Sequence, residues 1–340
     1  MKKIHKLVNQ FKHYEWGSAS FIPQFLNLNQ DGIPYAEMWM GTHNSAASKI
    51  ENNGNLVNLE EISGELPFLF KMLAVDKPLS VQVHPDKQQA ETGFEAENAA
   101  GLSLDDPRRN YKDSNKKCEI ICAITPFTLM AGFKEPEMII ASFGEYSPEQ
   151  EKMIDTLESI YPHDTAVYSP LYFNLITLEP GQAVFIPCGV PHAYISGFGL
   201  ELMNNSDNVI RGGLTKKHVD IDELMKVLNS NPYLPQVITP DSSSRFCYPI
   251  PCDDFSLSLI RSKGEPLAFH QTAPSICIVT EGELCIDNMR FKKGDSFFTA
   301  KDDNEILFKG DFSVYAASAS FAPSSNHQFE ARADSFGSNA

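Results

Sequence analysis

Two short stretches of the sequence place polar side chains where the pattern predicts β-strands. In PLSVQVHPDK, residues 78–87, Gln82 and His84 alternate with valines before Pro85 ends the run. Because side chains alternate across a strand, the amide and the imidazole share one face. In NKKCEIICAI, residues 115–124, Glu119 enters an otherwise apolar run. A carboxylate is costly there unless it is paired or binds a metal.

A third stretch, PGQAVFIPCGVPHAYISG, brings a histidine to the start of a predicted strand. Gly181 begins one strand, Pro187-Cys188-Gly189 forms a turn, and His192 opens the next strand. The spacing G-x5-P-x-G-x2-H resembles the second sequence motif of cupin barrels, in which the histidine points into the barrel and binds a metal.

Together these side chains offer the donor set of a metal site. The candidate ligands are one amide, two imidazoles and one carboxylate, from Gln82, His84, Glu119 and His192. Imidazole and oxygen ligands suit Zn²⁺, with Fe²⁺, Co²⁺ or Mn²⁺ as alternatives. Each element alone has a simpler interpretation, because a surface Gln-x-His pair or a salt-bridged glutamate is commoner than a ligand. The combination favours one divalent ion per chain, since nothing local satisfies these polar groups.

Short β-type runs dominate the elements that must position these side chains. The runs include CEIICAI, FNLITL, QAVFIP, SLSLIR, SICIVT and SVYAAS, and turn residues separate them. This spacing favours antiparallel sandwiches or barrels. Helices are fewer. Ser147 with Gln150 predicts a capping box and a helix that ends by Pro162, and Asp220 predicts the start of another helix.

Composition bounds the class of protein and its compartment. The 340 residues carry 28 Lys+Arg and 44 Asp+Glu, a formal charge of −16 that disfavours nucleic acid and anionic membranes as partners. The seven cysteines include no CxxC pair and fit free thiols in a reducing cytosol. The N-terminus lacks the apolar stretch of a signal peptide, and no long apolar window follows. We expect a cytoplasmic protein without nucleic-acid or membrane partners.

The segment after His192, AYISGFGLELMNNSDNVIRGGLTKKHVDIDEL, is similar to the type I phosphomannose isomerases. FLFKMLAVDKPLSVQVHPDK, AEMWMGTH and YEWGS carry the same resemblance, which extends from about Tyr14 to Asp222 and weakens in the C-terminal half. It implies an aldose–ketose isomerase of carbohydrate metabolism that interconverts mannose 6-phosphate and fructose 6-phosphate. Its partner would be a small-molecule sugar phosphate.

The resemblance also implies roles for individual residues. The zinc ligands would be the four candidate ligands named above. Groups associated with catalysis match Arg211, Glu201, Lys117 and Asp207. Groups associated with the substrate phosphate match Lys71, Ser80 and Lys217.

The reaction moves a proton between C1 and C2 through an enediol, so developing negative charge needs an electrophile close by. A bound divalent ion and Arg211 would supply positive charge. Glu201 is the first choice as the base, because it lies on the strand that leaves His192. Lys117 and Asp207 are second candidates.

Two features depart from the family pattern. The family usually has HKPE where this chain has Lys116-Lys117-Cys118-Glu119, so a lysine replaces the histidine associated with ring opening. Only 72 residues separate Glu119 from His192, which predicts a trimmed helical domain beside the site.

We therefore predict a mainly β fold of two cupin (jelly-roll) β-barrel domains with a small helical insertion. The catalytic cupin would comprise residues 1–135 and 168–232, with the insertion at 136–167. Residues 245–322 would form a cupin-like domain without a metal site, because TAKDDNE stands where a metal histidine would follow its second turn. Residues 323–340 would form a disordered tail.

Two other classes of function remain open from the sequence. One is a different metal cupin enzyme, such as an iron dioxygenase or a decarboxylase, although these normally use His-x-His. The other is a non-catalytic sugar-phosphate-binding module derived from the isomerase, which would have lost a ligand or the arginine. All four candidate ligands and Arg211 are present, which favours the isomerase.

Overall fold

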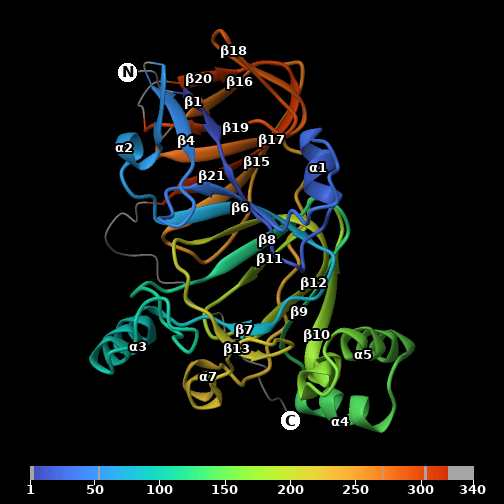
Figure 1. Cartoon of the computed structure of the whole chain (residues 1–340). Helices are drawn as coiled ribbons and strands as arrows, with labels where there is room; N and C mark the ends of the chain where they lie inside the picture. The colour runs from blue at the N-terminus through green and yellow to red at the C-terminus, as the bar shows by residue number, and fades with distance from the viewer. Residues whose placement is uncertain (1–3, 53, 271, 302–304, 321–340) are drawn as a thin grey trace, which may run out of the picture.

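Antiparallel β-strands make up most of the structure. The computed structural model describes residues 4–52, 54–270, 272–301 and 305–320, so the predicted disordered tail at 323–340 lies outside the described residues. The strands form two large sheets and a two-stranded ribbon, with the longer helices at the periphery (Figure 1). The prediction of a mainly β fold is confirmed.

The first large sheet combines strands from the two ends of the described chain. Its order is β14-β15-β21-β17-β19-β1-β4-β5, and β18 pairs with β17. Its members are β1 (Ile4–Val8), β4 (Lys49–Asn52), β5 (Asn55–Asn58), β14 (Arg245–Cys247), β15 (Phe255–Lys263), β17 (Ser275–Ile286), β18 (Met289–Lys292), β19 (Ser296–Thr299) and β21 (Asp311–Ala319). The predicted limits of the two domains remain a prediction. Strand β1 belongs to the predicted catalytic domain, but it pairs with β19 of the predicted C-terminal domain.

The second large sheet is organised around its longest strand, β12. This strand pairs antiparallel with β6, β7, β8 and β9 along its length. The members of the sheet are β2 (Gln10–Lys12), β3 (Glu37–Gly41), β6 (Phe68–Val75), β7 (Val81–Val83), β8 (Glu119–Ala123), β9 (Phe127–Phe133), β10 (Phe173–Leu178), β11 (Ala183–Ile186), β12 (His192–Asn204) and β13 (Ile210–Gly213). The ribbon consists of β16 (Leu267–His270) and β20 (Glu305–Phe308).

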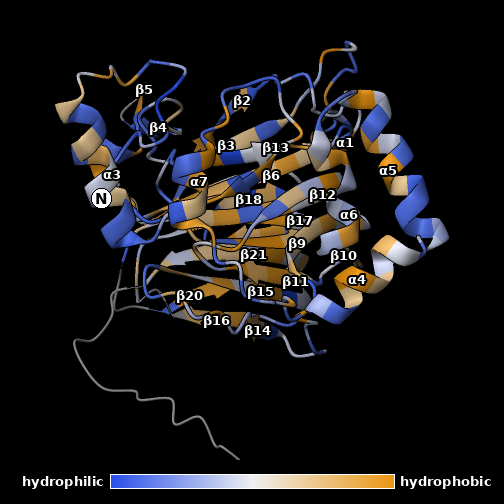
Figure 2. Cartoon of the chain, turned by 90° about the horizontal axis from the view of Figure 1, so that it is seen from below, coloured by the Kyte–Doolittle hydropathy of each residue, from blue (hydrophilic) through white to orange (hydrophobic). Residues whose placement is uncertain are grey.

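A shared core joins the two sheets. Phe70 and Leu200 of the second sheet belong to the same buried cluster as Leu257 and Ile276 of the first. Figure 2 shows hydrophobic residues concentrated in the strands of both sheets. Because burial of apolar surface is the main favourable term in folding, the two sheets stabilise each other.

Two of the helices match the sequence prediction. α5 (Pro148–Ile160) starts with a capping box between Ser147 and Gln150, and the Asp220 side chain caps α7 (Ile221–Val227). Both helices were predicted from these caps and are confirmed. The remaining short elements are α1 (Phe21–Leu26), α2 (Glu60–Ser63), α4 (Pro136–Gly144), η1 (Thr165–Tyr168) and α6 (Ser169–Tyr172).

Helix α3 (Lys87–Ala99) was missed by the sequence analysis. The Asp86 side chain accepts a hydrogen bond from the backbone nitrogen of Gln89, and the Gln89 side-chain oxygen accepts one from the backbone nitrogen of Asp86. The signal was present, because Asp followed three residues later by Gln resembles a capping box. The helix was hard to recognise because its sequence has no clear hydrophobic face, and only Ala90 in it is buried.

Candidate active site

Three of the four candidate ligands lie where strands of the second sheet begin or end, and the fourth, Gln82, is the central residue of β7. Glu119 is the first residue of β8, His192 is the first residue of β12, and His84 directly follows β7. Gln82 lies opposite His192 and, on the other side of β7, opposite Arg211. Val81 and Val83, which alternate with Gln82, are buried as the two-residue period requires. Long-range strand pairing thus gathers side chains that are far apart in the sequence.

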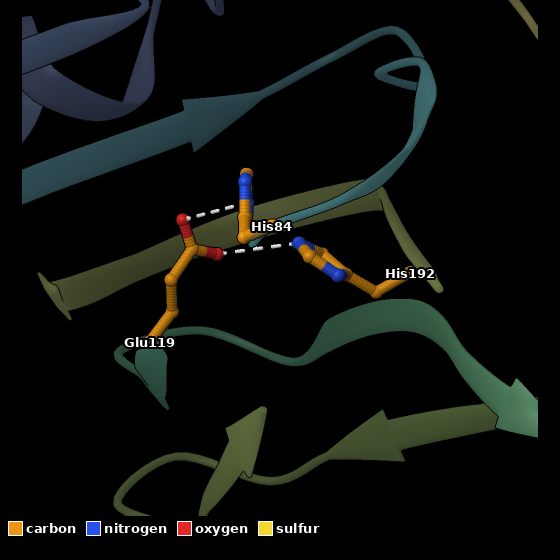
Figure 3. A group of neighbouring side chains, drawn as sticks. All are labelled: His84, Glu119 and His192. Carbon is orange, nitrogen blue, oxygen red and sulfur yellow. Dashed lines mark ion pairs between the residues drawn. The ribbon is translucent and has the colours of Figure 1, made fainter. Parts of the chain in front are cut away.

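His84, Glu119 and His192 converge on one point. The Nε2 atom of His84 lies 3.2 Å from Oε1 of Glu119, and Nε2 of His192 lies 3.3 Å from Oε2 (Figure 3). One potential donor atom from each residue lies within 4.8 Å of the others, and this is the one such group found among the described residues. The Gln82 amide nitrogen lies 3.2 Å from Nε2 of His192. The structure thus brings three of the four candidate ligands into one group, and the amide of the fourth, Gln82, lies beside it.

Backbone carbonyls orient both imidazoles. Nδ1 of His84 lies 2.8 Å from the Asn208 carbonyl, and Nδ1 of His192 lies 3.0 Å from the Val190 carbonyl. Since a carbonyl only accepts, each Nδ1 carries the proton and donates, which assigns the lone pair to each Nε2. Buried Nε2 of His84 has no hydrogen-bond partner within the described part of the chain. Both lone pairs therefore face Glu119.

The electrostatics keep His84 neutral and Glu119 ionised. Burial and the nearby Lys117 ammonium lower the pKa of His84 to about 3. Burial alone would raise the pKa of Glu119, but nearby positive charge, with the Lys117 ammonium as the largest contribution, holds that pKa well below its ordinary value. The Lys117 Nζ atom lies 3.0 Å from Oε1 of Glu119. Neutral imidazole and ionised carboxylate are the protonation states that bind a metal.

A pocket of about 590 Å³ opens beside this group. Gln82 and Glu119 line it, whereas His84 and His192 are buried behind its surface. Its wall also includes several side chains that the resemblance singled out, namely Lys71, Lys117, Glu201, Asp207, Arg211 and Lys217. The structure therefore brings most of the predicted site residues to one cavity.

Glu201 and Lys71 form a buried pair in this pocket. They lie opposite each other on β12 and β6, and Lys71 Nζ is 2.9 Å from Oε2 of Glu201. Lys71 Nζ also lies 3.6 Å from Oε1 of Glu37. Burial raises the pKa of Glu201 despite the attraction of Lys71. Burial would lower the pKa of Lys71, but the two glutamates raise it above its ordinary value, so the ammonium stays charged.

Two positive charges in the pocket, those of Arg211 and Lys217, form no direct ion pair with a carboxylate of the described residues. Both line the cavity, and neither makes a salt bridge with the described residues. Arg211 is half-buried, and burial lowers its pKa. A guanidinium nevertheless stays ionised at any working pH. This part of the pocket is suited to an anion.

Two predicted residues, Asp207 and Ser80, have less direct positions, and Lys116 lies away from the pocket. The Asp207 carboxylate lies 3.2 Å from Nε2 of His43, which lowers the pKa of Asp207 although burial opposes the shift. Ser80 directly precedes β7 and is absent from the residues that line the pocket. Lys116, at the family's histidine position, points to the C-terminal half, where its Nζ lies 2.9 Å from Oδ2 of Asp254. Lys116 therefore does not supply a substitute group to the pocket.

Three residues of the pocket wall were not predicted from the sequence. Glu37 accepts a hydrogen bond of 2.7 Å from the Trp39 indole, and both line the pocket. The signal was a carboxylate in the buried strand EMWMG. The Tyr194 hydroxyl donates to Glu119 at 3.2 Å. The two-residue period of a strand could have predicted Tyr194, because it lies two residues after His192 and therefore on the same strand face.

No helix in the described part of the chain is both long enough and apolar enough to cross a membrane.

Comparisons with known proteins place the chain in a family. Residues 4–136 match the model of "Phosphomannose isomerase type I, catalytic domain". Mannose-6-phosphate isomerase of Escherichia coli is 32% identical over 382 aligned residues, which cover 90% of this chain and 97% of that protein. The enzyme of Salmonella typhimurium is 33% identical, with 90% and 97% covered. A zinc-bound crystal structure of mannose 6-phosphate isomerase superposes with a TM-score of 0.85 at 31% identity, covering 94% of this chain and 100% of the other. The chain belongs to the type I phosphomannose isomerase family.

Proposed function

We propose that this chain is a zinc-dependent aldose–ketose isomerase that interconverts mannose 6-phosphate and fructose 6-phosphate. One observation carries the proposal. His84, Glu119 and His192 converge beside a pocket in which Arg211 and Lys217 form no ion pair with a described residue. A metal-binding group next to a site for an anion is what a metal-assisted reaction of a sugar phosphate requires. Membership of the isomerase family supports the same substrate.

Four side chains would hold one Zn²⁺ per chain: Gln82, His84, Glu119 and His192. The donor set fits the ion, because both imidazoles direct an unprotonated Nε2 toward the Glu119 carboxylate and Gln82 lies alongside. The unpartnered Nε2 of buried His84 supports a ligand role, since a buried polar atom without a partner is costly. When bound, zinc would act as a Lewis acid that stabilises negative charge on a substrate oxygen.

We assign the proton transfer between C1 and C2 to Glu201. Its carboxylate lines the pocket, and burial raises its pKa toward the range in which a base works well at neutral pH. Lys71 holds the carboxylate in place from 2.9 Å. Lys117 and Asp207 remain second candidates, because Lys117 is paired with Glu119 and Asp207 with His43.

Arg211 would stabilise the enediolate charge that develops during this transfer. It is opposite Gln82 in the strand register, so it lies next to the proposed metal ligands. Its guanidinium can grip an oxyanion with two parallel hydrogen bonds.

The substrate phosphate would lie near Lys217. This ammonium lines the pocket and forms no ion pair with a described residue. Lys71 was also expected to contact the phosphate, but its ion pairs with Glu201 and Glu37 favour a role in setting the charge of Glu201. Ser80, outside the lining of the pocket, is the weaker candidate.

We propose that residues 245–322 act in stability rather than in chemistry. Their strands share a buried core with the second sheet. Removal of this part of the chain should expose that core and cause aggregation. Light scattering of a chain ended at Asn229 would measure it, and a soluble monodisperse product would refute the role.

A coupled assay tests the proposed activity. Turnover of mannose 6-phosphate should disappear on chelation and return when Zn²⁺ is added, with about one ion bound per chain at full activity. Glu201→Gln should keep the bound zinc but lose turnover by about two to four orders of magnitude, the usual contribution of a general base. Full turnover in a verified metal-free sample would reject the zinc-dependent mechanism. Near-normal turnover of Glu201→Gln would reject Glu201 as the base.

A further inference from the structure

Three thiols lie close together at the junction between the proposed active site and the C-terminal half. The Sγ atoms of Cys118 and Cys252 are 3.7 Å apart, and the Cys118 thiol also interacts with Cys188. All three cysteines are free. Cys118 directly precedes Glu119, Cys188 lies in the turn before His192, and Cys252 precedes β15. None of these thiols has a role in the proposed reaction.

The two closest thiols differ in their exposure. Cys118 is only 5% exposed, whereas Cys252 is half-buried. Next to Cys252, Asp253 and Asp254 line a second pocket of about 700 Å³ together with Lys116. Cys252 is thus the thiol that a small oxidant in solution reaches first, and Cys118 is the thiol that can react next.

We propose that Cys118 and Cys252 form a reversible disulfide when a peroxide oxidises the protein, and that this bond switches off the metal site. The Cys252 thiol attacks a peroxide oxygen, the O–O bond breaks, and Cys252 becomes a sulfenic acid while one water leaves. The Cys118 sulfur then attacks the Cys252 sulfur and displaces the hydroxyl as a second water. Two thiols lose two protons and two electrons, and hydrogen peroxide is reduced to two waters. A dithiol reverses the step by exchange.

The hydrogen bonds around Cys118 connect this bond to Glu119. The Asn204 side-chain oxygen accepts from both the backbone nitrogen and the thiol of Cys118, each at 3.0 Å. The Asn204 amide donates to Asp254 at 2.7 Å. A disulfide requires an S–S distance of about 2.05 Å, so the sulfurs must close from 3.7 Å and the Cys118 thiol loses its bond to Asn204.

The residue that moves is bonded directly to Glu119. The Glu119 carboxylate lies within 3.0 to 3.3 Å of Lys117, His84 and His192. A displacement of about 1 Å is enough to misplace a reacting or ligating group. We therefore expect oxidation to loosen the bound zinc. The loss of zinc and of turnover rests on the proposed function, whereas formation of the disulfide does not.

The test uses the full-length, zinc-loaded protein, freed of reductant and titrated with hydrogen peroxide. Non-reducing tryptic digestion should link the peptide 118–134 to the peptide 246–261. Because these peptides also contain Cys122 and Cys247, fragmentation spectra must assign the bond to Cys118 and Cys252. A metallochromic indicator should detect released zinc. Turnover should fall about ten-fold or more, the size of effect seen when groups behind a metal ligand are lost, and dithiothreitol should restore it.

Two variants separate this bond from general oxidative damage. Cys252→Ser should resist peroxide in both turnover and zinc retention. Cys247→Ser removes an exposed cysteine from the same tryptic peptide, and it should respond as the parent protein does. A bond between Cys118 and Cys188, or equal inactivation of Cys252→Ser, would overturn the proposal. If the Cys118–Cys252 bond formed but all the zinc stayed bound, the proposed effect on the metal site would be refuted, and only the disulfide itself would stand. If the protein showed no isomerase activity, peptide mapping and zinc release would still decide the inference.

Discussion

Replacing Arg211 by lysine isolates the contribution of its guanidinium to the reaction. Arg211 lies opposite Gln82, lines the active-site pocket and forms no ion pair with a described residue. The charge is therefore available to the substrate and is not used to hold the fold. Lysine keeps one positive charge but loses the planar pair of donors. The substitution thus tests the two-bond grip on an oxyanion, with little change in net charge.

The expected magnitude follows from the half-buried position of the guanidinium. Loss of one donor to a developing oxyanion typically costs about 2.7 to 4 kcal/mol, which is about two to three orders of magnitude in kcat. If Arg211 acts mainly on the transition state, kcat and kcat/KM should fall together while KM changes little. We expect this pattern, because Arg211 lies beside the proposed metal ligands.

The assay is steady-state kinetics on mannose 6-phosphate with zinc content measured for each sample. Arg245→Lys, at an exposed position in β14, is the matched control and should behave as the parent protein. Lys217→Met provides the opposite pattern, in which KM rises and kcat stays near normal, because Lys217 is assigned to the phosphate. A steep rise in KM with normal kcat for Arg211→Lys would move Arg211 to the phosphate. No change in either parameter would refute its place in the active site.

Three further predictions concern the metal and the fold. Gln82→Leu should weaken zinc affinity less than His84→Ala, because a neutral amide is a poorer donor than imidazole; equal losses in a metal titration would count against Gln82 as a ligand. In the chelated protein, burial and Lys117 lower the pKa of His84 to about 3, below the value of about 6.5 of an unfolded histidine. As the pH falls, the unfolded state takes up this proton at a higher pH than the folded state does. The free energy of unfolding should therefore be highest above pH 6.5 and should decrease progressively as the pH falls toward 3. The thermal midpoint should drop accordingly, with a shallower slope in His84→Asn. Gly93→Ala should destabilise the fold by about 1 to 3 kcal/mol in urea unfolding, because the added carbon would meet the Tyr111 ring at 2.2 Å. Gly144→Ala, which meets nothing within 4 Å, is the control and should unfold at the parent's urea midpoint.

Local patterns in the sequence were enough to predict several features. The two-residue period of a strand places Gln82 and His84 on one face, and the valines beside Gln82 are buried on the other. The caps at Ser147 and Asp220 correctly predict where two helices begin. These features depend on neighbours within a few residues, so the chain needs no tertiary contact to specify them. The donor chemistry of the four candidate ligands is likewise a property of the residue types.

Other features were decided only when strands distant in the sequence paired. The register of β12 with β6 sets Glu201 against Lys71, which changes the expected role of that lysine from a free charge to a partner of the base. Arg211 and Lys217 have no ion-pair partners among the described residues, and the fold brings Cys118 to within 3.7 Å of Cys252, 134 positions later in the sequence. β1 joins the C-terminal sheet by pairing with β19. Strand pairing over such separations depends on which apolar faces pack together across the whole chain, and a short window of sequence does not contain that information.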